Sequence, residues 1–192
     1  MLPDSHLSPA RFGALMAEAY TSPRQSMRRI LAMQPDERAR LLMVVMGTVI
    51  SMIGFVALGQ REEVPGPGVI VFGYVVTILG ALLQYYILAW LVGTACRSFG
   101  GKGEFKDDRT MIAWLSLVTS PVSPLLLIGV RASDSPGIAL MVIAVTILLF
   151  TLLSSFIAEV HRFRSAVRVA GAVIVLLLII SISLSSLLPM PV

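Results

Sequence analysis

Five long apolar stretches exclude every Asp, Glu, Lys, Arg and His, and this exclusion is the strongest constraint that the sequence imposes on the fold. They are Leu41–Leu58, Val69–Cys96, Met111–Val130, Ile138–Ala158 and Val169–Leu188. A helix needs roughly 20 residues to cross about 30 Å of hydrocarbon, whereas a strand needs about half as many. A helix also satisfies its backbone groups within its own segment, as lipid requires. The sequence therefore predicts an all-α, polytopic membrane protein with five transmembrane helices.

The basic residues are sorted between the segments that connect these stretches. Thirteen of the fifteen precede the first stretch or lie between the second and third or the fourth and fifth; the two exceptions are Arg61 and Arg131. Cytoplasmic connections of membrane proteins carry the excess of Lys and Arg. We therefore expect a multi-pass protein whose amino terminus is cytoplasmic and whose carboxyl terminus is outside.

Composition limits the domain organisation. Hydrophobic residues make up 56% of the 192-residue chain, above the 45–50% apolar usage typical of soluble proteins. We expect residues 1–40 to form a cytoplasmic amphipathic region and residues 41–192 to form one membrane domain, without room for a soluble catalytic domain. The basic residues flank membrane segments, which favours contact with anionic lipids over binding to nucleic acid.

The sequence has few residues that could act in catalysis or bind a metal. His6 and His161 are the only histidines, and neither has a His or Cys at metal-ligand spacing. Glu159 and His161 are two positions apart on a predicted helix, so they point to different faces. The apolar stretches contain no ionisable residue of the kind that proton-coupled pumps and voltage sensors place inside the membrane. The sequence therefore predicts a protein that is not an enzyme and that uses no cofactor or metal.

The first 40 residues contain two predicted helix starts, at Ser8-Pro9 and at Ser22-Pro23. Apolar residues recur with helical spacing after each start, and arginines accompany them. Three interpretations remain open: packing across the cytoplasmic end of the bundle, contact with anionic lipid, or docking of a cytoplasmic partner. The candidate contacts to lipid headgroups or a partner are Arg24, Arg28, Arg29, Lys102 and Lys106.

The first predicted span carries small residues at helical spacing. Gly47, Ser51 and Gly54 recur at intervals of four and three, and small residues let helices approach closely in lipid. We interpret these three residues as a helix-packing face, and we expect oligomerisation through faces of this kind.

Polar and helix-breaking residues interrupt the second and third spans. Gln84 lies near the middle of the second span, where an amide needs an interior partner, so we expect it to face the bundle. The third span contains two prolines that predict a kink or break. That break is either a structural kink or a solute site of the kind found in transporters. Its candidate residues are Thr119, Ser120, Pro121, Ser123 and Pro124.

Three features together resemble the Yip family, the Rab-interacting membrane proteins of the early secretory pathway and their bacterial relatives. The first is Ser22-Pro23-Arg24-Gln25-Ser26-Met27-Arg28-Arg29-Ile30-Leu31. The second is Phe99-Gly100-Gly101-Lys102-Gly103-Glu104-Phe105, followed by Ala113-Trp114 and Pro121. The third is the predicted architecture of five spans after a cytoplasmic amino terminus. The Asp-Leu-Tyr-Gly-Pro motif of eukaryotic members is missing, so the resemblance implies a bacterial member, in the cytoplasmic (inner) membrane and without Rab partners.

The resemblance implies a non-enzymatic role in membrane organisation or trafficking. Together with the basic segments and the small-residue faces, it leads us to expect an oligomeric membrane scaffold or partner-binding protein. Its expected partners are membrane lipids and either further copies of itself or another membrane protein. The alternative is a channel, transporter or lipid-moving protein, with a path near Gln84, Pro121 and Pro124.

Overall fold

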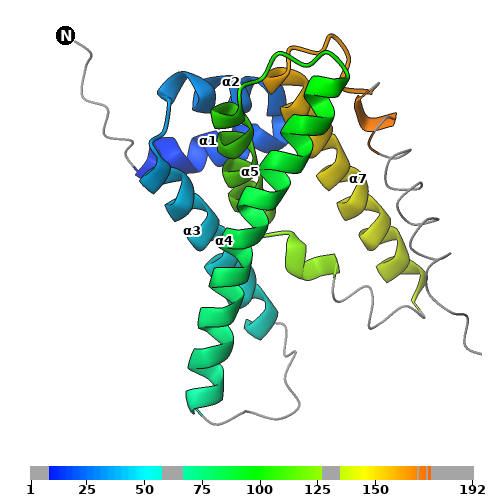
Figure 1. Cartoon of the computed structure of the whole chain (residues 1–192). Helices are drawn as coiled ribbons and strands as arrows, with labels where there is room; N and C mark the ends of the chain where they lie inside the picture. Colours follow the sequence, from blue (N-terminus) through cyan, green and yellow to red (C-terminus); the bar gives the residue numbers. More distant parts are fainter. Residues whose placement is uncertain (1–8, 58–66, 127–134, 168, 172, 174–192) are drawn as a thin grey trace, which may run out of the picture.

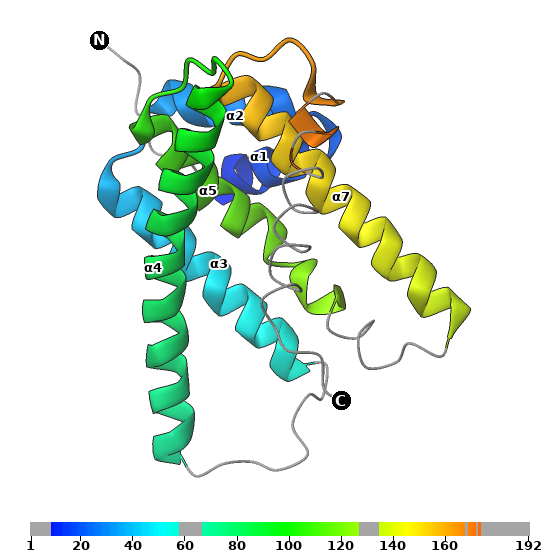
Figure 2. The same ribbon diagram turned by 45° about the vertical axis from the view of Figure 1, so that its right-hand side comes forward.

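The computed structural model describes residues 9–57, 67–126, 135–167, 169–171 and 173, and within these ranges the chain is helical without strands. The labelled helices are α1 (Pro9–Thr21), α2 (Pro23–Met33), α3 (Glu37–Ala57), α4 (Pro67–Ser98), α5 (Phe105–Thr119) and α7 (Pro136–Val160). Helices α1 and α2 lie across one end of the molecule (Figure 1), and α3, α4 and α7 extend away from that end (Figure 2). Helix α5 lies between them.

Three of the five predicted spans correspond to long apolar helices. Among the described residues, α3, most of α4 and α7 are long and apolar enough to cross a membrane. They coincide with the first, second and fourth apolar stretches of the sequence. The fifth predicted span, Val169–Leu188, lies almost entirely outside the described residues.

The third predicted span, Met111–Val130, breaks after Thr119, as its prolines predicted. None of its described residues belongs to a helix long and apolar enough to cross a membrane, so that part of the five-span prediction is wrong. Helix α5 begins earlier, at Phe105, and ends at Thr119 after 15 residues. At 1.5 Å per residue it is about 22 Å long, which is shorter than the hydrocarbon core. Most of its apolar residues are buried by protein, including Met111, Trp114 and Leu117. The stretch is apolar because α5 is the central helix of the fold, and it breaks where the prolines begin.

The amino-terminal helices share one core with the rest of the fold. Leu15 and Ala19 of α1 and Met27 and Ile30 of α2 are buried in the same cluster as Trp114 of α5. The Trp114 indole also donates a hydrogen bond to the Ser26 hydroxyl at 3.2 Å. Of the three interpretations of this region, packing on the bundle therefore accounts for its apolar faces.

The small-residue face of α3 packs against α5 and its break. A Cβ atom on Gly47 would lie 2.8 Å from the backbone oxygen of Ser116, and one on Gly54 would lie 2.6 Å from Cγ of Pro124. Between them, the Ser51 hydroxyl lies 3.0 Å from that of Ser123. The face is filled within the chain, so the expectation that it mediates oligomerisation is wrong.

Hydroxyl groups satisfy the backbone where α5 breaks. Pro121 and Pro124 lack the N–H groups that would continue a helix. The Ser120 hydroxyl donates to the Leu117 carbonyl at 2.7 Å. The Ser120 carbonyl in turn accepts from Ser51 at 3.3 Å and from Ser123 at 3.2 Å. The break is thus fixed by hydrogen bonds, one of which comes from α3.

Replacement of Gly47 by Ala is expected to destabilise the protein by about 1–3 kcal/mol, the usual range for overpacking. The reason is that the nearest atoms belong to the α5 backbone, which cannot turn away as a side chain can. Thermal unfolding in detergent measures the effect. The control is Gly80→Ala on α4, where a Cβ meets nothing within 4 Å; equal effects of the two substitutions would contradict the prediction.

Candidate functional site

The first turns of α5 carry neighbouring opposite charges that point to different helices. Asp108 is fully buried, whereas Arg109 keeps 23% of its side chain exposed. Successive helix residues point about 100° apart, so the two side chains reach different partners. Each belongs to one cluster that ties α5 to its neighbours.

The first cluster joins Asp108 to α4 and to the residue after α7. One carboxylate oxygen, Oδ2, lies 2.8 Å from Nη1 of Arg97, and the other, Oδ1, lies 2.9 Å from Nε2 of His161. The His161 side chain is fully buried as well. Because Nε2 and Oδ1 are both buried without another hydrogen-bond partner in the described chain, each serves as the partner of the other.

The backbone of the loop after α4 fixes the protonation pattern of His161. The N–H of Gly103 donates to Nδ1 of the imidazole at 3.2 Å. Nδ1 must therefore be the unprotonated nitrogen of a neutral ring, and the ring proton is on Nε2, directed at Asp108. One side of the imidazole thus binds the backbone of Gly103, and the other side binds the Asp108 carboxylate.

Close approaches of the backbone make this cluster possible. A Cβ atom on Gly93 of α4 would lie 2.0 Å from Oδ2 of Asp108, and one on Gly101 would lie 2.7 Å from Nδ1 of His161. Gly101 also donates to the Cys96 carbonyl at 2.9 Å, and Lys102 donates to the His161 carbonyl at 3.3 Å. The glycines therefore let α4 and the loop close over the buried pair of Asp108 and His161.

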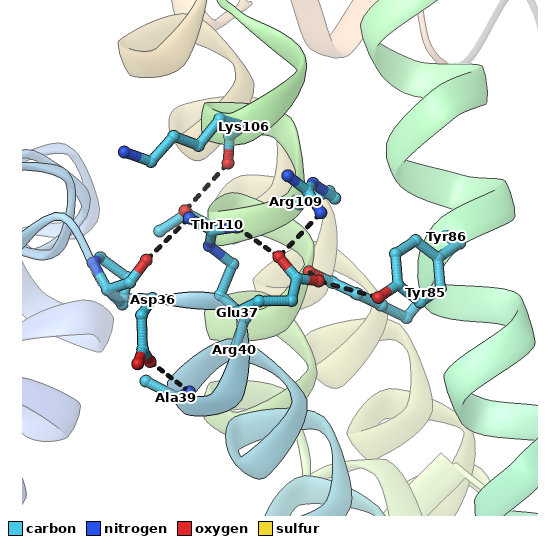
Figure 3. A network of polar contacts seen from close by, with 10 residues as sticks. Asp36, Glu37, Ala39, Arg40, Tyr85, Tyr86, Lys106, Arg109 and Thr110 are labelled. Carbon is cyan, nitrogen blue, oxygen red and sulfur yellow. Dashed lines mark hydrogen bonds and ion pairs between the residues drawn. The ribbon is translucent and has the colours of Figure 1, made fainter.

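The second cluster surrounds Glu37 in the first turn of α3, as Figure 3 shows. Its Oε2 accepts from Arg40 at 2.6 Å and from Arg109 at 2.7 Å. Its Oε1 accepts from the Tyr86 hydroxyl at 2.8 Å. Arg40 is buried, and it also donates to the Pro35 carbonyl at 2.7 Å. One carboxylate thus links the first turns of α3 and α5 to Tyr86 in the interior of α4.

Three of the five predicted headgroup contacts are engaged within the chain, and two of these, Arg24 and Arg28, reach α7 or the residues that follow it. Arg28 forms a two-pronged ion pair with Glu159, at 2.8 and 3.3 Å, and this pair raises the pKa of the Arg28 guanidinium. Arg24 donates to the Phe163 carbonyl at 2.5 Å. Arg28 is nevertheless 74% exposed, so the pairing fixes α2 on α7 without hiding its charge.

The other three predicted contacts lie on the surface. Arg29 pairs with Glu18 of α1 at 2.8 Å and remains 55% exposed. Lys102 and Lys106 are exposed in the loop and at the start of α5. These cations stay available at the end of the molecule that α1 and α2 cover.

The predicted intramembrane sites do not come together. Gln84 is exposed on α4, so the expectation that it faces the bundle is wrong. It precedes Tyr85 and Tyr86, both of which reach Glu37. It therefore lies at the level of the charged residues that begin α3, where an exposed amide is tolerated. Thr119 and Ser123 instead border a cavity of about 280 Å³ against α7, completed by Leu115, Leu149, Phe150 and Leu153.

The buried cluster was missed in the sequence because each of its members reads as an end-of-helix charge. Asp108 is interpretable as a favourable charge in the first turn of a helix, and His161 as a residue past the end of a span. The usable signal was the coincidence of a lone histidine, an acidic residue and a Gly-rich loop at the same predicted side of the membrane. Sequence spacing alone does not show that they meet.

A fold of long apolar helices, held together at one end by two ion-pair clusters, defines a helical membrane protein. A model of the Yip1 domain matches residues 17–187. The chain therefore belongs to the Yip family, as its motifs indicated. No curated protein and no solved structure matches it.

Proposed function

We propose that this protein is a non-enzymatic membrane scaffold of the Yip type that binds another membrane protein, or a second copy of itself, through α4. The observation that carries the proposal is an exposed apolar surface formed by the carboxyl end of α4 and the residue that follows it. It consists of Ile87, Trp90, Leu91 and Phe99, which are 52%, 59%, 47% and 76% exposed. We call these four residues the α4 surface.

The position of the α4 surface distinguishes it from an ordinary lipid-facing stripe. Tyr86 contacts Glu37 in the first turn of α3. From Ile87 to Ser98, α4 therefore continues past the start of α3 by twelve residues, or about 18 Å. Exposed apolar side chains in that extension lie beside a charged network rather than beside the apolar part of α3. Trp is also a residue that interfaces favour.

The charged residues support a structural role for the rest of the fold. Asp108 joins α5 to Arg97 of α4 and to His161 after α7. Glu37 joins α3 to Tyr86 of α4 and to Arg109 of α5, and these contacts hold the fold together. Exposed cations at the same end, including Lys102 and Lys106, favour anionic lipid as a further partner. With that end in the cytoplasm, as the charge distribution favours, the protein would lie in a bacterial cytoplasmic membrane.

The first test is native mass spectrometry of the full-length protein, extracted with mild detergent from its own membrane. We expect a defined oligomer or a complex with another protein. The double variant Ile87→Ala/Trp90→Ala should lose that assembly. The matched control is Ile143→Ala/Ile147→Ala, which removes similarly exposed side chains from α7 and should leave the assembly intact.

Two outcomes would count against the proposal. One is equal loss of the assembly in the α4 and α7 variants, which would remove the α4 surface from the interface. The other is a wild-type monomer that retains a stoichiometric lipid or small molecule. That result would favour the alternative of a channel, transporter or lipid-moving protein, for which the cavity beside Thr119 and Ser123 is the specific observation.

A further inference from the structure

The segment Phe99–Glu104, which we call the clasp, closes over His161 by a small number of backbone contacts. Gly101 donates to Cys96, Lys102 donates to the His161 carbonyl, and Gly103 donates to Nδ1 of His161. The Arg97 guanidinium adds a contact of 3.5 Å to the Gly103 carbonyl. Only the contact to Nδ1 depends on the protonation state of a side chain.

A second proton on the imidazole is incompatible with that contact. Protonation converts Nδ1 from an acceptor to a donor, which would then face the N–H of Gly103. Among the residues that the structure describes, the proton finds no other acceptor there, because Oδ1 of Asp108 lies against Nε2 on the opposite side of the ring. Loss of a buried hydrogen bond leaves a donor unsatisfied, which costs more than the bond contributes.

The groups that face His161 also limit how far they can stabilise a positive charge on its imidazole. Arg97 from α4 and Asp108 from α5 already form an ion pair at 2.8 Å, and the Cys96 carbonyl of α4 accepts from the Gly101 N–H. Phe163 stacks on the imidazole, with ring centres 5.9 Å apart. Glu159, on the preceding turn, is turned towards Arg24 and Arg28. Protonation would therefore leave the cluster of Arg97, Asp108 and His161, of which Asp108 and His161 are fully buried, with a net positive charge.

We propose that the clasp is a proton-sensitive device, closed while His161 is neutral and opened when His161 becomes an imidazolium. Histidine is the side chain whose charge ordinarily changes between about pH 5 and pH 8. Opening would displace Phe99, a member of the α4 surface, so acidification would alter that surface. The opening itself does not depend on whether the α4 surface binds a partner.

The test is hydrogen exchange of the full-length protein in lipid nanodiscs, at about pH 8 and about pH 5, corrected for the intrinsic pH dependence of exchange. We expect the protection of the Gly101–Gly103 amides to fall about tenfold at the lower pH, the change that one lost hydrogen bond produces. The peptide Met111–Val118 of α5 serves as an internal reference and should stay protected. Unchanged clasp protection, or a parallel loss in α5, would overturn the proposal.

Two substitutions separate the roles of the imidazole nitrogens. His161→Asn offers an acceptor near the position of Nδ1 but takes up no proton, so its clasp should stay protected at both pH values. His161→Gln reaches towards Asp108 but offers Gly103 no acceptor, so its clasp should exchange rapidly at both. If the His161→Asn variant lost clasp protection at low pH as the wild type does, another group would be responsible for the pH response, and the proposal would be overturned.

Discussion

Replacement of Asp108 by Asn is expected to cost about 2–4 kcal/mol of folding free energy, because each hydrogen bond to a charged group contributes about 1.5–3 kcal/mol and the Asn keeps only one of two. Asp108 is fully buried and accepts on both oxygens, from Arg97 and from His161. An Asn offers one oxygen for two donors, and its amide group must face one of them. His161 cannot change tautomer to help, because Gly103 already donates to Nδ1.

Asp107 provides the matched control for this prediction. It is the neighbouring carboxylate in the first turn of α5, so it shares the favourable interaction with the helix dipole, but it is not fully buried. Asp107→Asn should therefore cost no more than about 1 kcal/mol. Detergent-based equilibrium unfolding compares the two variants, and similar losses would show that Asp108 acts only as a helix-end charge.

A second variant tests the ion pair itself. Arg97→Gln combined with Asp108→Asn should cost less than the two single substitutions added together, because no charge is left buried without its partner. Additive losses would mean that Arg97 and Asp108 stabilise the fold independently.

Replacement of Gly93 by Ala is expected to have the second large effect, a loss of about 2–4 kcal/mol from displacement of the buried pair. The new Cβ would lie 2.0 Å from Oδ2 of Asp108 and 3.0 Å from Nη1 of Arg97. The carboxylate cannot move aside without leaving Arg97 or His161. This loss outweighs the gain of about 1 kcal/mol that Ala brings to a helix interior.

Gly73 of the same helix is the control. A Cβ there meets nothing within 4 Å, so Gly73→Ala should be neutral or stabilising by the helix-propensity term alone. The measurement is the midpoint of thermal unfolding of each variant in the same detergent. A stabilising Gly93→Ala would mean that α4 and α5 are further apart than the structure has them.

The helices that the sequence predicted best are those that consist of a long run of residues without charge. Helices α3, α4 and α7 were predicted to within a few residues, because an uninterrupted absence of charge has one structural meaning in a membrane. The same signal failed for Met111–Val130. A helix buried by protein and a helix facing lipid are both apolar, and sequence does not distinguish the two.

Local sequence patterns identified several structurally important residues, but they did not show which residues these side chains contact. The small residues of α3 and the prolines after α5 were recognised separately, and the structure brings them together at Ser51, Ser123 and Pro124. Arg28 was recognised as a cation on an amphipathic helix, but its partner Glu159 lies 131 residues away. Pairings over such separations depend on how the helices pack.

The sequence alone determined that this is an all-α membrane protein, that its basic residues gather in certain connections, and that its motifs are those of the Yip family. These properties follow from composition and from patterns of residues close together in the sequence, which decide directly whether a segment favours water or lipid. Only the tertiary structure decided that α5 is a central helix and that Asp108, His161 and Gly103 meet in one buried cluster. Such a meeting requires three segments to approach within hydrogen-bonding distance, and the packing of α4, α5 and α7 sets that approach.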